Sequence, residues 1–230
     1  EVVAKKLEKV ARVAKTGNKE SQKEEIVLKS IVQNLENSKN IRSIDFSKDD
    51  YIKYVTPLQL LTDKPVLYVC NVDEESILSG NNYVEEVKKS IKDKSAEIII
   101  LAAGIESEIN ELSEHEERKM FLNDLGLDEP GSNKLLKSTY SLLSLHTYFT
   151  AGIKEVRAWT IPIGSKASQA AGVIHSDFEK GFIKTEVISY SDYIGYGSEL
   201  KAKEAGKMRV EGKDYVVNDG DVMHFLFNVW

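Results

Sequence analysis

The sequence predicts an α/β protein made of three parts: a helical hairpin, a βαβ unit and a small α+β domain. Apolar residues recur every three or four positions in residues 1–36, as they do in paired amphipathic helices. Two apolar, β-branched runs flank a helical segment in residues 66–101, which is the pattern of a βαβ unit. Several short strand-like segments follow from residue 145, and together these patterns favour a mixed architecture.

Formal charge is spread unevenly over the three parts of the chain, residues 1–55, 56–144 and 145–230. Their net charges are +3, −8 and −1, and the whole chain carries −6. The acidic middle part is a poor surface for nucleic acid, whereas the mildly basic start is a better candidate.

Composition is typical of a globular protein from a reducing compartment. Cys70 is the only cysteine, so no intrachain disulfide can form. No apolar run approaches the ~20 residues that span a bilayer, and no signal-peptide pattern is present. We predict a cytoplasmic monomer without membrane contact. Because the sequence begins without Met and inside a helical pattern, we also expect a fragment or a processed chain.

Residues 1–36 predict two helices joined by a short polar turn that contains Gly17, a residue typical of helix ends. The apolar residues of the two helices follow coiled-coil spacing: Val3, Leu7, Val10 and Ala14, then Leu28, Val32 and Leu35. The basic residues that lie off this seam are Lys5, Lys6, Lys9 and Arg12. They form either a solvated face of a structural arm or a surface for a polyanion, and the residues alone favour the solvated face.

The central candidate site is a strand that ends in a polar loop. Residues 66–70 form an apolar, β-branched run, which predicts a strand covered on both faces. Asn71, Asp73 and Glu74 follow at its carboxyl end, where open α/β sheets bind ligands. An Asn amide and an acidic group there can read the edge of a nucleotide base. They can also simply cap a turn, and spacing alone favours the cap.

A helix over residues 83–92 and a second apolar strand over 96–101 complete the βαβ unit. The second strand ends in the small-residue loop Ala102–Gly104, and the two strand ends together predict a shallow pocket for a base. Further helices, one beginning at a capping box at Ser113 and one at Gly131, are expected to cover the sheet.

Residues 145–230 predict a small α+β domain with the strand and helix content of a β-grasp. The strands expected from apolar and β-branched patterns cover residues 156–161, 181–188, 214–217 and 221–229. A short helix is expected over 199–205, and Asn218–Gly220 is a strong turn signal.

Several chemistries have no motif in this sequence. There is no Gly-x-x-x-x-Gly-Lys-Ser/Thr segment, so no phosphate-binding loop is visible. The four histidines and Cys70 lack metal-ligand spacing, so we expect no zinc site. His175 is interpreted either as a polar contact on a binding loop or as part of a structural turn.

Longer motifs resemble a known family. Residues Leu60–Glu74 are similar to the fourth nucleotide-binding motif of the YchF/Obg-like ATPases. Four more segments resemble the TGS domain of that family: Tyr148–Gly152, Glu155–Thr160, Gln169–Phe182 and Asp219–Phe225. The resemblance covers essentially the whole chain, with the motifs in the family's order.

This resemblance implies an Obg-related P-loop nucleoside-triphosphate hydrolase that binds ATP or GTP together with Mg²⁺ and associates with the ribosome. It implies that residues 1–55 are a coiled-coil arm inserted into the G domain. Residues 56–144 would be the C-terminal part of that G domain, and residues 145–230 a TGS domain with a β-grasp fold.

The resemblance also implies a base site. The family replaces the usual Asn-Lys-x-Asp motif by Asn-x-x-Glu, a change associated with the use of ATP, and residues 71–74 have this form. An Asp placed for guanine accepts hydrogen bonds from its N1–H and amine, and adenine offers no such pair of donors. The base-binding residues implied in this way are Asn71, Val72, Glu74, Ala102 and Ala103.

The phosphate loop, the switch regions and the magnesium ligands of the family would all lie upstream of Glu1. This chain would therefore hold no catalytic residue and no metal ligand, because phosphoryl transfer depends on groups around the phosphates. We predict that the chain alone does not hydrolyse ATP and binds nucleotide weakly or not at all.

An alternative function is an RNA- or ribosome-binding module with no hydrolysis of its own. The basic residues that motivate it are Lys5, Lys6, Lys9, Arg12, Lys180, Lys184, Lys207 and Arg209. They are otherwise solvated charges. A TGS domain from a tRNA synthetase or a stringent-response enzyme is a third possibility, against which the strand end at residues 71–74 and the helical start both argue.

Overall fold

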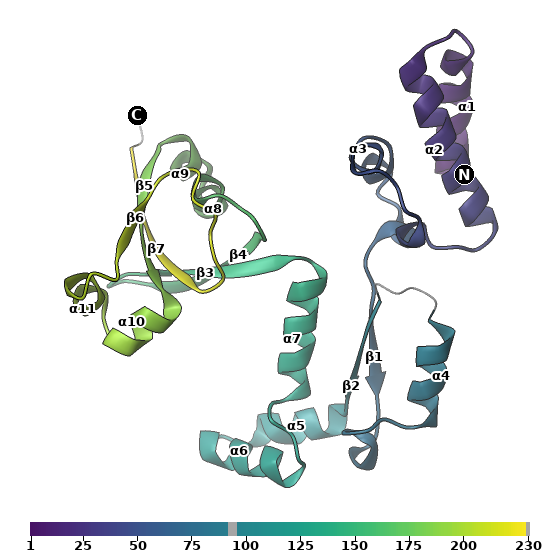
Figure 1. Ribbon diagram of the computed structural model, residues 1–230. Helices are drawn as coiled ribbons and strands as arrows, with labels where there is room; N and C mark the ends of the chain where they lie inside the picture. The colour runs from purple at the N-terminus through teal and green to yellow at the C-terminus, as the bar shows by residue number, and fades with distance from the viewer. Residues whose placement is uncertain (92–95, 229–230) are drawn as a thin grey trace. The chain divides into compact units, whose positions relative to one another are not determined.

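The computed structural model describes residues 1–91 and 96–228 (Figure 1). The chain divides into two compact units, Glu1–Lys134 and Leu135–Trp230, which are described separately below. The division into three domains stays a prediction. In the part of the chain that the structure describes, no helix is both long enough and apolar enough to cross a membrane.

The first unit begins with helices α1 (Val2–Ala14) and α2 (Lys19–Glu36), which pack against each other as a hairpin (Figure 1). Gly17 in the turn between them has φ +88°, a backbone conformation that suits glycine. Asn18 caps α2, because its side chain accepts a hydrogen bond from the Ser21 N–H at 3.0 Å. The helical hairpin expected from the sequence is thus present.

The apolar side of α2 is wider than the predicted seam. Val27 and Ile31 are buried together with Leu28, although only Leu28 belongs to the coiled-coil spacing. The segment that follows α2 covers them with the buried residues Ile41, Tyr54 and Val55. Its elements are η1 (Ile41–Ser43), α3 (Lys48–Asp50), the π-helical turn η2 (Tyr51–Val55), η3 (Thr56–Leu58) and η4 (Leu61–Asp63).

The βαβ unit consists of strand β1 (Leu67–Asn71), helix α4 (Asn82–Ser90) and strand β2 (Glu97–Leu101). The two strands are parallel and in register, with Leu67 opposite Glu97 and Asn71 opposite Leu101. Of the helix expected over residues 83–92, Lys92 lies outside the described residues. The expectation that β1 is covered on both faces is wrong, because Val69 is 45% exposed. Among the described residues, only β2 pairs with β1.

Three helices complete the first unit and lead out of it: α5 (Ala103–Glu111), α6 (His115–Asp124) and α7 (Gly131–Leu142). Helix α5 differs from the sequence prediction, in which residues 102–104 form a loop. Its buried residues Ile105 and Ile109 are four apart, the spacing that marks one helix face. The capping box expected at Ser113 is also wrong, because α6 has Glu114 at its N-cap position without a side-chain cap.

The second unit is built on a five-stranded mixed sheet in the order β4-β3-β7-β5-β6 (Figure 1). The strands are β3 (Leu145–Ala151), β4 (Val156–Pro162), β5 (Phe182–Ser189), β6 (Arg209–Glu211) and β7 (Asp221–Phe227). Only the β3–β7 pair is parallel among the pairs of this sheet that the structure describes. The helices are α8 (Ala167–Ile174), α9 (Ser176–Lys180), α10 (Tyr190–Tyr196) and α11 (Glu199–Glu204).

The core of this unit lies between α8 and one face of the sheet. Ala167, Ala170 and Ala171 of α8 are fully buried in the same cluster as Tyr148 and Val187. The Tyr148 hydroxyl donates a hydrogen bond to the Ala170 carbonyl at 2.8 Å, and burial raises its pKa well above the ordinary value. Small residues on α8 therefore let the helix approach the sheet closely enough for this bond.

One predicted strand of this unit is wrong. Residues 214–217 form no strand, and Val216 makes only an isolated bridge with Lys166. The strand-like pattern arises because Val217 is buried and Tyr215 packs against the core. The edge strand β6 was not anticipated, because it has only three residues. Of the strand expected over residues 221–229, Val229 lies outside the described residues.

Candidate base-binding site

The candidate site lies where β1 and β2 end next to each other. Asn71 is the last residue of β1 and pairs with Leu101, the last residue of β2. The Val72 N–H donates to the Leu101 carbonyl at 2.9 Å, so the pairing continues one residue beyond the strand. The Val72 N–H is therefore engaged in the pairing of the two strands. The Val72 carbonyl is the backbone group of this residue that a ligand could contact.

A side-chain hydrogen bond joins the two strand ends. The Asn71 Oδ1 atom accepts from the Ala103 N–H at 2.9 Å, across 32 positions of the sequence. Ala103 is the first residue of α5, and Ala102 before it is buried. With its oxygen used in this way, the Asn71 amide has its Nδ2 donors left for another partner.

The acidic residues of the loop have different roles. Asp73 caps the short helix η5 (Glu74–Ser76), because its Oδ1 atom accepts from the Ser76 N–H at 3.0 Å. Glu74 is the first residue of η5 and is exposed. The capping interpretation thus applies to Asp73, whereas Asn71 makes a long-range contact and Glu74 carries the exposed carboxylate.

The structure brings together four of the five predicted base-binding residues: Asn71, Val72, Ala102 and Ala103. Glu74 follows Val72 by two positions at the same strand end. A cavity of about 260 Å³ also reaches Asn71, but it opens towards α4 and is lined by Tyr68, Val69, Cys70, Tyr83, Val84 and Val87. That apolar cavity shares only Asn71 with the predicted base site.

The eight basic residues proposed for nucleic acid differ in their surroundings. In the helical hairpin, Lys5 pairs with Glu1 at 2.7 Å and Lys6 with Glu24 at 2.8 Å. Lys207 lies 3.6 Å from Asp192. The other candidates apart from Arg209 are exposed: Lys9, Arg12, Lys180 and Lys184.

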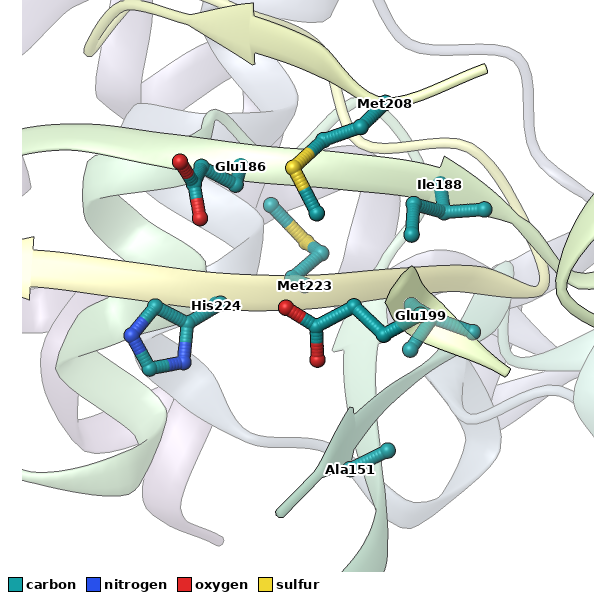
Figure 2. A pocket seen from close by; sticks show the side chains of 8 residues that line it. Ala151, Glu186, Ile188, Glu199, Met208, Met223 and His224 are labelled. Atoms are coloured by element: carbon teal, nitrogen blue, oxygen red, sulfur yellow. The ribbon is translucent and has the colours of Figure 1, made fainter. Parts of the chain in front are cut away.

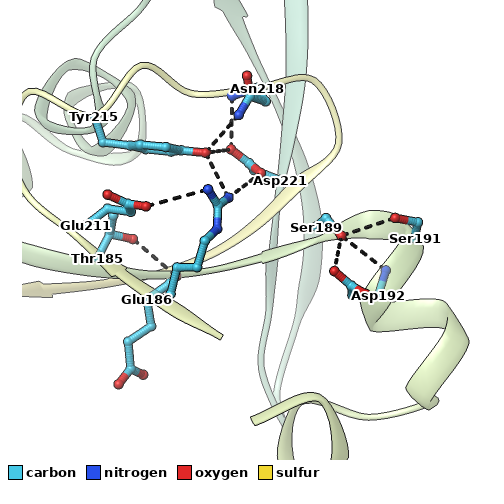
Figure 3. Close-up of polar contacts among 10 residues, drawn as sticks. Thr185, Glu186, Ser189, Ser191, Asp192, Glu211, Tyr215, Asn218 and Asp221 are labelled. Carbon is cyan, nitrogen blue, oxygen red and sulfur yellow. Dashed lines mark hydrogen bonds and ion pairs between the residues drawn. The ribbon is translucent and has the colours of Figure 1, made fainter. Parts of the chain in front are cut away.

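Arg209 belongs to a polar network around the buried carboxylate of Asp221, and Figure 3 shows Tyr215 and Asn218 beside that carboxylate. Asp221 is 3% exposed and accepts hydrogen bonds from the Tyr215 hydroxyl at 2.7 Å and the Asn218 N–H at 2.9 Å. The Arg209 guanidinium lies 3.7 Å from Asp221 and donates to the Tyr215 hydroxyl at 3.1 Å. Burial raises the pKa of Tyr215, and its hydrogen bond to Asp221 adds to the rise. Both contacts are made by one Nη atom of Arg209, and the other Nη atom lies 3.5 Å from Glu211, so each Nη atom has a partner within the protein.

A second polar cluster, of Glu186, Glu199 and His224, lines a small cavity at the five-stranded sheet of the second unit (Figure 2). Glu186 and His224 are opposite each other on β5 and β7, and with Glu199 and Met208 they line a cavity of about 10 Å³. This space is about the size of one water molecule. Over residues 1–91 and 96–228, no group of three His, Cys, Asp or Glu side chains could hold a metal ion.

His175 lies at the start of α9. Its Nδ1 atom accepts a hydrogen bond from the Asp177 N–H at 3.2 Å, so the imidazole caps the helix. This contact agrees with the structural-turn interpretation of the residue.

Comparison with known proteins relates the whole chain to one group. Residues 145–228 match the family YchF-GTPase_C, described as a protein of unknown function (DUF933). Over 223 residues the chain is 49% identical to the ribosome-binding ATPase YchF of Pasteurella multocida. This alignment covers 97% of this chain and 61% of that protein. It is 48% identical over 231 residues to the protein of the same name from Bacillus subtilis, covering 100% of this chain and 63% of that protein.

A solved structure of the Schizosaccharomyces pombe YchF GTPase matches with a TM-score of 0.83 and 34% sequence identity. The match covers 97% of this chain and 61% of that one. The chain therefore spans about three fifths of the length of these relatives, and its α/β fold matches theirs.

Proposed function

Because the chain belongs to the YchF family, we propose that it supplies the base-recognition edge of a ribosome-associated hydrolase that binds ATP, with GTP as the weaker ligand. The observation that carries this proposal is the Asn71–Ala103 hydrogen bond, which joins the two strand ends into one edge. Ligands of open α/β sheets bind at the carboxyl ends of the strands, and this edge is such an end.

The polar groups at the edge suit adenine better than guanine. The Asn71 Nδ2 group is a donor and the Val72 carbonyl is an acceptor. Adenine presents an acceptor at N7 and a donor at its exocyclic amine, whereas guanine presents acceptors at both N7 and O6. A carbonyl at Val72 would therefore attract the adenine amine and repel the guanine oxygen.

Glu74 adds to this preference in our proposal. Guanine binding by the usual motif uses an Asp that accepts from two donors of the base, and adenine lacks that pair. Glu74 stands where the usual motif has this Asp and is exposed at the strand end, whereas the neighbouring Asp73 has one carboxylate oxygen engaged in its cap.

We further propose the domain roles that the family resemblance implies. Residues 1–55 would form the coiled-coil arm, 56–144 the C-terminal part of the G domain, and 145–230 a TGS domain with a β-grasp fold. The five-stranded mixed sheet packed on α8 supports the last assignment. In this proposal Mg²⁺ accompanies the bound nucleotide, as the family resemblance implies.

The test compares ATP and GTP affinities of the full-length protein by isothermal titration calorimetry. We expect tighter binding of ATP, and an Asn71→Ala variant that loses about tenfold in ATP affinity, because a hydrogen bond of this kind contributes about 1 kcal/mol or more. Asn82→Ala is the matched control, since Asn82 is an exposed asparagine in the first turn of α4. Equal affinities for the two nucleotides, or a preference for GTP, would contradict the proposal.

A second candidate function is binding of RNA or the ribosome without hydrolysis. The exposed basic residues Lys9, Arg12, Lys180 and Lys184 favour it, because they are accessible to phosphates. Binding of RNA that weakens steeply with salt, in a full-length protein that binds no nucleotide, would support this function instead.

A further inference from the structure

A carboxylate from α5 binds the start of α7. Glu106 Oε1 accepts from the Gly131 N–H at 2.6 Å, and its Oε2 accepts from the Ser132 N–H at 3.0 Å. The first N–H groups of a helix have no partner within the helix, and the helix dipole favours a negative charge there. Glu106 therefore caps α7 with charge-assisted hydrogen bonds, although 25 residues separate it from Gly131.

Glu106 is also one helical turn away from the candidate base edge. Its own N–H donates to the Ala102 carbonyl at 3.1 Å. Ala103, between them, donates its N–H to Asn71. The first turn of α5 is thus held at one end by the base edge and at the other by the start of α7.

Gly131 makes this arrangement very close. A Cβ atom at Gly131 would lie 3.0 Å from Glu106 Oε1 and 3.0 Å from Leu101 Cβ. Leu101 is the residue that pairs with Asn71 in the sheet. The start of α7 therefore lies directly against the end of β2, and a Cβ atom at Gly131 would require Leu101 or Glu106 to shift.

We propose that Glu106 is a positioning residue of the base site: by binding the start of α7, it holds the Ala102–Ala103 edge in the place where a base is recognised. This inference rests on the proposed function, since it needs the edge to bind a base. It adds a residue that neither touches the nucleotide nor belongs to the Asn-x-x-Glu motif.

The coupling has a consequence for α7. The helix begins in the first compact unit and its residues from Leu135 onward belong to the second. Because coupling between two sites is reciprocal, nucleotide at the base edge should also protect the first turn of α7 from hydrogen exchange.

Two variants disturb the contact from opposite sides. Glu106→Ala removes the carboxylate, and Gly131→Ala introduces a Cβ atom against it. Glu108→Ala is the matched control, because Glu108 is an exposed glutamate on the same helix. Glu106→Gln keeps the side-chain size and one acceptor oxygen, and replaces Glu106→Ala if that variant does not fold.

The first measurement is amide hydrogen exchange of this 230-residue chain by NMR. We expect faster exchange at Gly131 and Ser132 in Glu106→Ala, and also at Ala103, whose N–H binds Asn71. Faster exchange at α7 alone, with Ala103 unchanged, would mean that Glu106 is only a helix cap and would overturn the inference.

The second measurement is ATP affinity of the full-length protein. We expect Glu106→Ala and Gly131→Ala each to weaken ATP binding roughly fivefold, which is the lower end of typical coupling between sites. The control Glu108→Ala should leave ATP binding unchanged. The double variant should be no weaker than the worse single variant, because both changes break the same contact. ATP affinities equal to that of the unaltered protein would overturn the inference. An unaltered protein that binds no ATP would contradict the proposed function itself, and the exchange of Ala103 would then decide whether Glu106 supports the edge.

Discussion

At the scale of single residues, carboxylates with similar chemistry have very different surroundings. Asp221 is 3% exposed and has Arg209, Tyr215 and Asn218 around it, whereas the Asp214 side chain is 69% exposed and forms a surface ion pair with Lys166. A buried charge that loses its partners is costly, but a surface ion pair contributes little. The two aspartates should therefore respond differently to replacement.

We predict that Asp221→Ala destabilises the second unit by about 3 kcal/mol, because it leaves the Tyr215 hydroxyl and the Asn218 N–H without their acceptor and removes one ion-pair partner of Arg209. Asp214→Ala, the control, should leave the urea midpoint almost unchanged, because the ion pair of Asp214 with Lys166 lies at the surface. Urea unfolding followed by circular dichroism measures both. Similar losses for the two variants would show that the Asp221 network does not stabilise the fold.

Single residues also show why the base site could be located only in part from the sequence. The position of Asn71 and Glu74 at a strand end follows from the apolar run before them and from the family motif. The bond from Asn71 to Ala103 joins residues 32 positions apart, and no local pattern encodes it. The same is true of Glu106, whose partners follow 25 and 26 positions later.

At the scale of elements, the helical hairpin is held to the segment after it by a polar contact beside the apolar one. Glu20, in the first turn of α2, accepts a hydrogen bond from the Tyr54 hydroxyl at 2.9 Å and forms an ion pair with Lys53. The contact with Lys53 lowers the pKa of Glu20, and the bond from Tyr54 lowers it further. The ionised form is therefore the one that links α2 to η2.

This pKa shift predicts a pH dependence. A carboxyl whose pKa is lower in the folded than in the unfolded chain stabilises the fold above its unfolded pKa, and the contribution is lost as the pH falls through the folded pKa. We expect Glu20→Gln to unfold at lower urea concentration than the unaltered chain at pH 7, and this difference to shrink as the pH falls below the ordinary glutamate pKa and through the lowered pKa of Glu20. Glu8→Gln, an exposed change on α1, should leave the pH 7 midpoint unchanged. A Glu20→Gln midpoint that follows the unaltered chain at every pH would contradict the role of this contact.

Elements with strong periodic patterns could be predicted, and short or small-residue elements could not. The hairpin helices, β1, β2, β5, β7 and α7 all have apolar spacing that matches their structure. Helix α5 begins with Ala-Ala-Gly, and α8 consists largely of small residues, so their helical character depends on packing against the sheets rather than on local pattern. Residues 214–217 show the opposite error, because the burial of Val217 produces a strand-like pattern although the segment makes only an isolated bridge at Val216.

At the scale of the whole molecule, each compact unit has apolar clusters of its own. Leu28 is fully buried in the first unit, and Met223 is buried in the second. No residue of either cluster belongs to the other unit. The two units should therefore respond separately to a loss of core packing.

We predict that Leu28→Ala and Met223→Ala each remove about 2 to 5 kcal/mol of stability from one unit and leave the other unchanged. Differential scanning calorimetry of the chain should resolve this as a shift of one transition in each variant. Leu61→Ala serves as control, since Leu61 is 80% exposed. A single transition that moves by the same amount in both variants would mean that the units unfold together.

The Asn71–Ala103 hydrogen bond is made between two groups of the protein itself, and this bears on the entropy of binding. Ordering a side chain at a binding surface costs about 0.5–1.5 kcal/mol when it happens at the moment of association. In this chain the Asn71 rotamer is set during folding instead. An arriving base would meet an edge that is already ordered, so its association would require no conformational step at Asn71.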